Sequence, residues 1–166
     1  MDRNISDIAN SGIEGDGYRD PLENLVVHQS RRASLASMSA VSALLAPLGL
    51  RWSEAATLLV ISWNKGIVSS EIGKHLGIQR SNMVPIITRL RGDALVEQVR
   101  RDGRSAGLYL TVSGKATAAR VQAILGAHDR MMLDDLEAHD RAAFLSILHR
   151  DWGFDSDEKD GGAFLR

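Results

Sequence analysis

The chain has 166 residues, of which 44% are hydrophobic and 25% are charged, and its formal net charge is −1 at pH 7. The absence of cysteine excludes disulfides, thiol redox sensing and cysteine-based zinc sites. No apolar run approaches the roughly 18 residues that a membrane span needs, and no basic-then-apolar start indicates a signal peptide. We therefore expect a cytoplasmic protein without a membrane partner.

The charge is unevenly distributed along the chain. Residues 74–104 contain seven Lys or Arg and three Asp or Glu. Residues 129–166 contain five Lys or Arg and ten Asp or Glu. Because salt screens each charge over about 10 Å, a local basic patch matters more to an anionic partner than the net charge does. The sequence therefore confines the basic charge to one central segment.

The first predicted elements are a tail and a long helix. Residues 1–20 are acidic and polar, which predicts a disordered tail. A helix is predicted from Pro21, which suits a first helical position, to Ala46, within a dimerisation segment of residues 21–48. Its apolar residues recur at three- and four-residue spacing, and small residues on its other side permit close approach of a second helix. Pro47 ends it.

A second helix is predicted over residues 53–63, with Ser53 as its N-cap. Trp52 and Trp63 flank this helix. After a turn, Ile67 and Val68 form a candidate short strand. The predicted core residues of the helix are Leu58, Leu59 and Ile61.

Two shorter helices follow across a tight turn. The first covers residues 70–76, with Ser69 as N-cap and Gly77 as a left-handed stop. Gly73 lies inside it, where glycine costs about 1 kcal/mol relative to alanine, so we expect a second helix to cross closely there. The next helix covers residues 80–91 and buries Met83, Ile86, Ile87 and Leu90. Its outer face presents donors and acceptors for base edges and phosphates, namely Gln79, Arg80, Ser81, Asn82, Thr88 and Arg89.

Other interpretations of this helix remain open. Ser81 and Asn82 could be capping residues, and the arginines could form only a solvated face. Pro85 is compatible with the helix if regular structure starts near Ser81, which leaves Pro85 among the first-turn residues whose N–H groups have no helical partner.

A basic hairpin comes next. Strands are predicted over residues 95–99 and 108–110, and the arginines at the tip repel one another unless an anionic partner binds. Two helices, a turn and a basic hairpin predict a winged helix-turn-helix over residues 50–112 that binds DNA. The predicted DNA-binding residues of the wing are Arg100, Arg101, Asp102 and Arg104.

Two further helices close the chain. One covers residues 111–136, starts at Thr111 as N-cap, and is apolar on more faces than one small domain can cover. The other covers residues 140–152, with Ala143, Phe144, Ile147 and Leu148 as its buried face. Residues 113–153 are therefore predicted to be dimerisation helices, and residues 154–166 a flexible tail. The fold class is mainly α with a small β-wing, in a homodimer whose recognition helices enter successive major grooves of a near-palindrome.

The run from Asp102 to Gly114, DGRSAGLYLTVSG, resembles the D-x-R-[ST]-x-x-L-x-L-T-x-x-G pattern of the multiple antibiotic resistance regulator (MarR) family of bacterial transcription factors. The resemblance extends over about residues 22–152. It implies an obligate dimer, binding to inverted repeats, and usually repression relieved by a small ligand. It also implies that Arg104 enters a minor groove and that Asp102 holds the wing arginines. Because the wing is shorter than is common in the family, Arg101 is also a candidate for the tip contact.

The resemblance implies that an effector binds between the dimer helices and the reading head. Arg31 and Arg32 could clamp a carboxylate or phosphate, or could pair with acidic helices of the partner chain. The tryptophans could instead be core residues. The full set of candidates is His28, Arg31, Arg32, Met38, Trp52, Trp63 and His128.

The histidines lack the spacing of zinc ligands, and no catalytic constellation is visible, so we expect no metal, no cofactor and no enzyme activity. We predict a nucleoid-associated, ligand-responsive homodimeric repressor that binds double-stranded operator DNA and a small aromatic or carboxylate-bearing effector. The alternative is a winged-helix dimer that acts as a protein-interaction module for an acidic partner. Such a module does not need the polar outer face of the second short helix.

Overall fold

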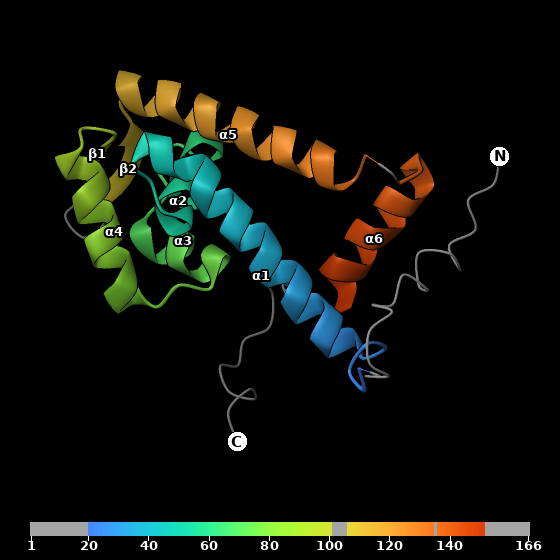
Figure 1. The fold of residues 1–166 in the computed structure, drawn as a ribbon. Helices are drawn as coiled ribbons and strands as arrows, with labels where there is room; N and C mark the ends of the chain where they lie inside the picture. Colours follow the sequence, from blue (N-terminus) through green and yellow to red (C-terminus); the bar gives the residue numbers. More distant parts are fainter. Residues whose placement is uncertain (1–19, 101–105, 135, 152–166) are drawn as a thin grey trace. The chain divides into compact units, whose positions relative to one another are not determined.

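The computed structural model describes residues 20–100, 106–134 and 136–151. It divides into two compact units, Met1–Met38 and Ser39–Arg166. The described part is mainly helical with one small sheet, which confirms the predicted fold class (Figure 1). The elements in chain order are α1 (Val26–Leu45), η2 (Ala46–Leu48), α2 (Trp52–Trp63), α3 (Ser69–Leu76), α4 (Arg80–Gly92), β1 (Val96–Arg100), β2 (Ala106–Leu110), α5 (Val112–Met132) and α6 (Ala138–Asp151).

The described part of the first unit begins with a turn, so the prediction that the first helix begins at Pro21 is wrong. Residues 21–24 form the turn, in which the Leu22 N–H donates to the Asp20 carboxylate at 2.9 Å. An aspartate side chain that bonds the backbone two residues later favours a turn over a helix. The helix α1 therefore begins at Val26 and continues into the second unit.

In the second unit, α1 ends close to the predicted position. The α-helix stops at Leu45 and passes into η2, which contains Pro47. Gly49 then adopts the left-handed conformation with φ 67°. Val41 and Leu45 are buried in the core of this unit.

Helix α2 is the central helix of the second unit, since it contacts α3, α4, α5 and β2. Leu58 and Ile61 are buried, as predicted, and Leu59 is partly buried. The prediction of Ser53 as N-cap is wrong. The helix starts at Trp52, and the Glu54 carboxylate accepts the Arg51 N–H at 2.8 Å in the capping role.

The helix-turn-helix is formed by α3 and α4. Helix α3 starts at Ser69, one residue earlier than predicted, and the Glu71 carboxylate accepts the Val68 N–H at 3.2 Å. Gly77 has φ 64°, which confirms it as the left-handed stop. A Cβ on Gly73 would lie 2.8 Å from the Ile78 carbonyl oxygen and 3.1 Å from Cγ of Met83. The expected close crossing at Gly73 is therefore confirmed.

The wing strands β1 and β2 pair antiparallel, from Val96 opposite Leu110 to Arg100 opposite Ala106. The predicted third strand is present as a single bridge between Ile67 and Leu108. The Leu108 N–H donates to the Ile67 carbonyl at 2.9 Å, which ties the hairpin to the segment before α3.

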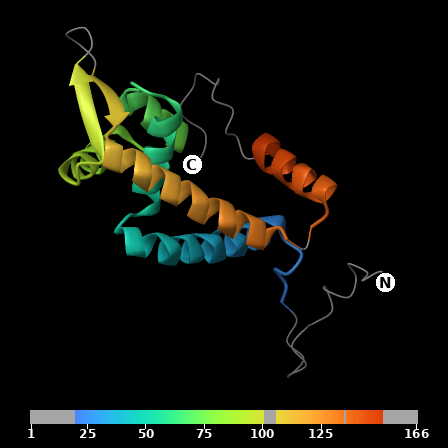
Figure 2. The same ribbon diagram turned by 90° about the horizontal axis from the view of Figure 1, so that it is seen from above.

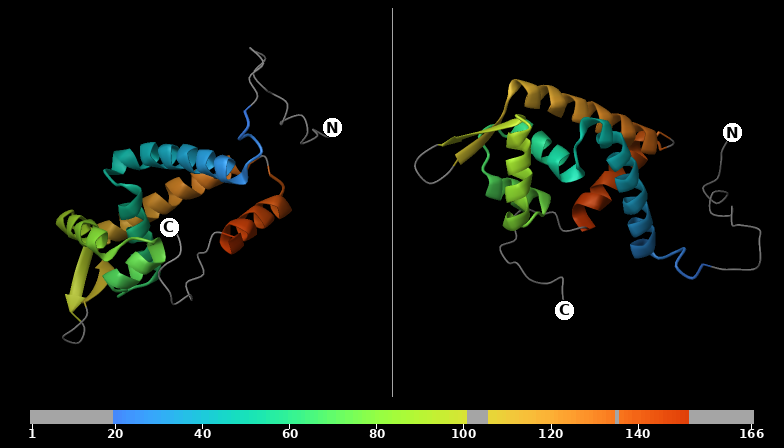
Figure 3. Two further views of the ribbon diagram at one scale, coloured as in Figure 1. Left: turned by 90° about the horizontal axis from the view of Figure 1, so that it is seen from below. Right: turned by 60° about the vertical axis from the view of Figure 1, so that its left-hand side comes forward.

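Helix α5 starts beside the hairpin and runs past α2 (Figures 2 and 3). Thr111 is its N-cap, as predicted, because Oγ1 accepts the Gly114 N–H at 2.9 Å. The helix ends at Met132, four residues before the predicted end.

Helix α6 differs from the prediction in its burial. Phe144 and Ile147, which were expected to face a core, are exposed within the single chain. The apolar face is therefore present but is not covered by the chain's own described residues.

Some predictions fall on residues outside the described ranges. They concern the acidic tail before residue 20, the wing tip at residues 101–105 and the tail from residue 152 onward. Within the described ranges, no single helix is long and apolar enough to cross a membrane, although α1 and α2 meet that criterion together as a bent pair.

Candidate nucleic-acid interface

Helix α4 has one buried and one exposed face. Met83, Ile87 and Leu90 are buried, and Ile86 is partly buried, which confirms the predicted inner face. The predicted outer residues are all exposed on the other side of the helix, namely Gln79, Arg80, Ser81, Asn82, Thr88 and Arg89. The helix is thus anchored by its apolar stripe and presents its polar side chains to solvent.

The position at which α4 starts shows whether Ser81 and Asn82 cap the helix or lie on its surface. The N-cap is Gln79, which makes no side-chain cap hydrogen bond. Ser81 and Asn82 are the second and third residues of the helix, so the interpretation of either as its N-cap is wrong. Both side chains are exposed and belong to the surface of the helix.

Pro85 lies deeper in α4 than the expected first-turn position. The helix starts at Arg80, so Pro85 is its sixth residue and lies beyond the first turn. Its missing N–H removes the hydrogen bond that the Ser81 carbonyl would otherwise accept. The proposed first-turn position is therefore wrong. The helix continues because Met83 and Ile87 are buried on either side of the proline.

A groove of about 420 Å³ lies between the start of α3, helix α4 and the hairpin. Arg80, Val84, Thr88 and Arg91 occupy one stripe of α4, since helical residues four, eight and eleven apart lie on similar sides. The described residues that line the groove include two arginines and no carboxylate. Its polar and stripe residues are Ser69, Ser70, Arg80, Val84, Thr88, Arg91 and Gln98.

Of the seven groove residues named above, the sequence interpretation predicted only Arg80 and Thr88 as DNA contacts. Arg91 was not included among the predicted DNA contacts, and Val84 was not considered although its side chain is 58% exposed. Both could have been found from their spacing to Arg80 and Thr88. An exposed valine beside polar groups can contact a thymine methyl group, which supplies sequence readout without a hydrogen bond.

The Arg89 side chain is partly exposed, but its guanidinium group contacts other residues of the chain. Its Nη1 lies 3.1 Å from Oε1 of Glu54, and its Nη2 donates to the Gly49 carbonyl at 2.7 Å. A third contact joins Nε to the Asp93 carboxylate at 3.7 Å. The Glu54 side chain is only 4% exposed, so Arg89 neutralises a buried charge. This network connects α4 to the start of α2 and to the turn after η2.

The hairpin carries the other predicted DNA contacts. Arg100 is the last residue of β1 and is exposed. Arg101, Asp102 and Arg104 lie outside the described residues. The choice between the tip arginines therefore stays a prediction.

The candidate effector residues have diverse environments. Arg31 and Arg32 are exposed, His28 is half-buried, and Met38 is at the limit of exposure. These four lie in the first unit, whereas the remaining three lie in the second.

The three candidates of the second unit do not form one site. Trp52 is 42% exposed and Trp63 is 76% exposed, so the core-packing interpretation of the tryptophans is wrong. They lie at opposite ends of α2, about 16 Å apart at a rise of about 1.5 Å per residue. His128 is buried. The tryptophans are therefore too far apart to hold one small ligand between them.

The chain is similar to known DNA-binding repressors. No family model matches the sequence. The chain is 31% identical over 112 residues to the HTH-type transcriptional repressor Rv2887 of Mycobacterium tuberculosis, which covers 66% of this chain and 81% of that protein.

Solved structures give matching results. The transcriptional repressor CouR bound to a 23-mer DNA duplex is 29% identical, with a TM-score of 0.76, over 83% of this chain and 99% of the CouR chain. CouR bound to p-coumaroyl-CoA is 28% identical, with a TM-score of 0.72, over 83% and 99%. A Mycobacterium tuberculosis MarR family protein, Rv2887, in complex with salicylic acid is 28% identical, with a TM-score of 0.61, over 75% and 94%. The sequence comparison and the structure comparison thus both find that the chain is similar to Rv2887.

Proposed function

Because the chain belongs to the MarR family of transcriptional regulators, we propose that it is a homodimeric repressor that binds operator DNA and is released by a small effector. The observation that carries this proposal is the exposed face of α4, where Arg80 and Arg91 flank Val84 and Thr88 in a groove that the described residues line without a carboxylate. Such a surface attracts phosphates and offers polar and methyl contacts to base edges.

The residues of α4 have different parts in this proposal. Arg80 and Thr88 read bases in the major groove, together with Gln79, Ser81 and Asn82. Arg91 contacts a phosphate, and Val84 packs against a thymine methyl. Arg89 positions the helix through Glu54 and is left out of the base-contacting set.

The wing supplies the second contact. Arg100 and the tip residues Arg101 and Arg104 lie near or in a minor groove, whose potential attracts arginine. Two copies of the reading head, related by two-fold symmetry, bind the halves of an inverted repeat. The protein then acts on the bacterial chromosome, in the cytoplasm.

The effector is proposed to be a small aromatic acid or its thioester, as in the ligands of the Rv2887 and CouR structures. Arg31 and Arg32 are its proposed anchors, since both guanidinium groups are exposed on α1 and can bind a carboxylate in bidentate geometry. We propose His28 and Met38, which lie in the same unit as the two arginines, as further contacts.

Fluorescence anisotropy with labelled DNA from upstream of the protein's own gene tests DNA binding. We expect Arg80→Ala to weaken binding by at least about tenfold, the effect of removing one good base contact worth about 1–3 kcal/mol. Arg120→Ala is the control, because Arg120 is exposed on α5 and does not line the groove. Equal affinities of the two variants would reject α4 as the reading element.

The same anisotropy assay tests whether an effector releases the protein from DNA. Adding salicylate to the wild-type complex should lower the anisotropy, whereas the Arg31→Ala, Arg32→Ala double variant should bind DNA normally and resist release. Release of this variant at the wild-type salicylate concentration would remove the arginine clamp from the proposal.

A further inference from the structure

The exposed face of α4 contains two adjacent apolar residues, Val84 and Pro85. They lie between Ser81 and Thr88, each of which is three or four residues away from them and is also exposed. Residues at this spacing are neighbours on a helix surface. The polar residues of α4 therefore surround a small apolar patch.

Val84 contributes little to the core of the chain. The buried residues of α4 are Met83, Ile87 and Leu90, which form its inner side. Valine has a lower helix propensity than alanine, and in a helix its χ1 angle is largely restricted to one rotamer. Val84 therefore presents its two methyl groups to solvent in a nearly fixed orientation, at a small cost to the helix.

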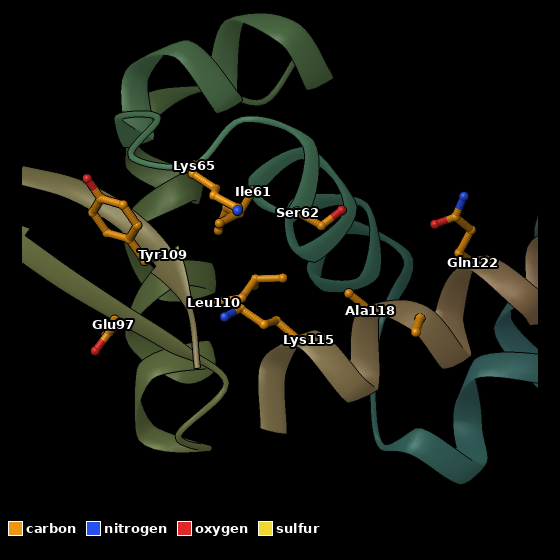
Figure 4. Close-up of a pocket in the computed structure, with 10 residues that line it drawn as sticks. Ile61, Ser62, Lys65, Glu97, Tyr109, Leu110, Lys115, Ala118 and Gln122 are labelled. Atoms are coloured by element: carbon orange, nitrogen blue, oxygen red, sulfur yellow. The ribbon is translucent and has the colours of Figure 1, made fainter. Parts of the chain in front are cut away.

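The hairpin separates the groove beside Val84 from a second cavity. Gln98 lines the groove at α4, whereas its neighbour Glu97 lines a cavity of about 540 Å³ at Lys65 and Lys115 (Figure 4). Successive residues of a strand point to opposite faces, which places the Glu97 carboxylate away from the groove. The groove and the cavity share no described lining residue, so the chemistry of the groove depends on its own side chains.

The polar groups around Val84 do not select one pyrimidine base. In the major groove thymine presents the O4 acceptor and a C5 methyl group, whereas cytosine presents an N4 amino donor. The hydroxyl groups of Ser81 and Thr88 can donate to the first base or accept from the second. A carboxylate, which would accept only from cytosine, does not occur among the described residues that line the groove. The surroundings of Val84 are therefore compatible with any pyrimidine that carries a C5 methyl group.

Arg80 relates this methyl group to a second base. It lies one turn before Val84 and lines the same groove. The commonest specific contact of arginine is to O6 and N7 of guanine. Four residues span about 6 Å along the helix axis, which is less than two base-pair steps of about 3.4 Å. The methyl-bearing pyrimidine and the guanine are therefore close neighbours in a half-site.

We propose that Val84 reads the C5 methyl group of a pyrimidine within about two base pairs of the guanine contacted by Arg80, and that 5-methylcytosine satisfies this contact as thymine does. An operator in which the cytosine at this position is methylated is therefore bound more tightly than the same operator without the methyl group. The inference rests on the proposed DNA-binding function and adds to it a dependence on DNA methylation.

A scan of labelled duplexes from upstream of the protein's own gene tests the contact by anisotropy. Each duplex has one thymine replaced by uracil, which lacks the methyl group, or one cytosine replaced by 5-methylcytosine. In each half-site we expect one pyrimidine position at which the methyl group lowers the Kd about fourfold, the effect of removing one methyl-sized group from water. Cytosine and 5-methylcytosine are then compared directly at that position, where the same factor is expected.

Val84→Ala should make the affinities for cytosine and 5-methylcytosine nearly equal. This variant is expected to fold, because Val84 is exposed and alanine has the higher helix propensity. Val112→Ala is the matched control and should keep the fourfold factor, since Val112 is 86% exposed on α5 and does not line the groove.

Three outcomes would overturn the proposal while DNA binding persists. They are the absence of any methyl-sensitive position, a factor that Val84→Ala leaves unchanged, and equal wild-type affinities for cytosine and 5-methylcytosine at a position where uracil weakens binding. Failure of the wild type to bind any of the duplexes would instead refute the proposed DNA-binding function, and this inference with it.

Discussion

Three exposed arginines of α4 have different environments. Arg80 and Arg91 line the groove beside the hairpin, whereas Arg89 contacts Glu54, Asp93 and the Gly49 carbonyl. Helical spacing separates the first two from the third. It does not reveal that a buried carboxylate on α2 takes Arg89 out of the DNA-contacting group.

Arg89→Ala is expected to lower the free energy of unfolding by about 1–2 kcal/mol. Glu54 would keep a buried charge without its partner, which costs about 3–5 kcal/mol in fully buried pairs and less here because Arg89 is 43% exposed. Urea denaturation of the variant and of Arg91→Ala measures the difference. Equal losses of stability in the two variants would contradict the assigned role of Arg89.

At the scale of elements, Gly73 fixes how closely α3 approaches the turn and α4. We expect Gly73→Ala to lower the free energy of unfolding by up to about 2 kcal/mol, because the helix propensity gain of about 1 kcal/mol offsets only part of an overpacking cost of about 1–3 kcal/mol. The backbone carbonyl of Ile78, which a Cβ would meet at 2.8 Å, cannot rotate away as a side chain can.

Gly92→Ala is the matched control for this substitution. A Cβ at Gly92 meets no described atom within 4 Å, and the residue ends α4. Thermal and urea unfolding should show this variant to be at least as stable as the wild type. If Gly73→Ala were the more stable variant, the close packing of the helix-turn-helix would be disproved.

The wing contributes arginines whose effect is measurable by salt dependence. Replacing Arg101 or Arg104 by alanine should reduce the slope of log Kobs against log salt by about one for each phosphate that the variant no longer neutralises. Anisotropy titrations at several salt concentrations measure the slope. Slopes equal to that of the wild type in both variants would refute the wing assignment.

The sequence predicted some of the element ends that depend on local chemistry and missed others. Gly77 as the stop of α3 and Thr111 as the N-cap of α5 need only the residue itself and its near neighbours. The start of α1 was missed because the Asp20 side chain forms a turn. The cavity at Lys65 and Lys115 was also missed, because it forms only where segments distant in sequence meet.

At the scale of the whole molecule, the single chain leaves apolar side chains exposed on its terminal helices. They include Leu35 on α1, Met131 on α5, and Phe144 and Ile147 on α6. Scattered exposed apolar residues are ordinary, but such sets on successive helices indicate an interface. This is the structural support for the proposed homodimer.

Light scattering coupled to size-exclusion chromatography measures the oligomeric state. We expect a mass of about 36 kDa at micromolar concentration, twice the 18.1 kDa of the chain. Phe144→Asp should shift the mass toward that of one chain, because a buried charge without a partner is costly at an interface. A wild-type mass of 18.1 kDa would contradict the dimer.

The central claim is that two copies of α4 and of the wing read one inverted repeat. A footprint on DNA from upstream of the protein's own gene tests it most directly. We predict two protected half-sites with centres one helical turn, about 10–10.5 base pairs, or a multiple of it apart, both absent in Arg80→Ala. Protection of a single half-site, or a footprint that Arg80→Ala leaves intact, would contradict it.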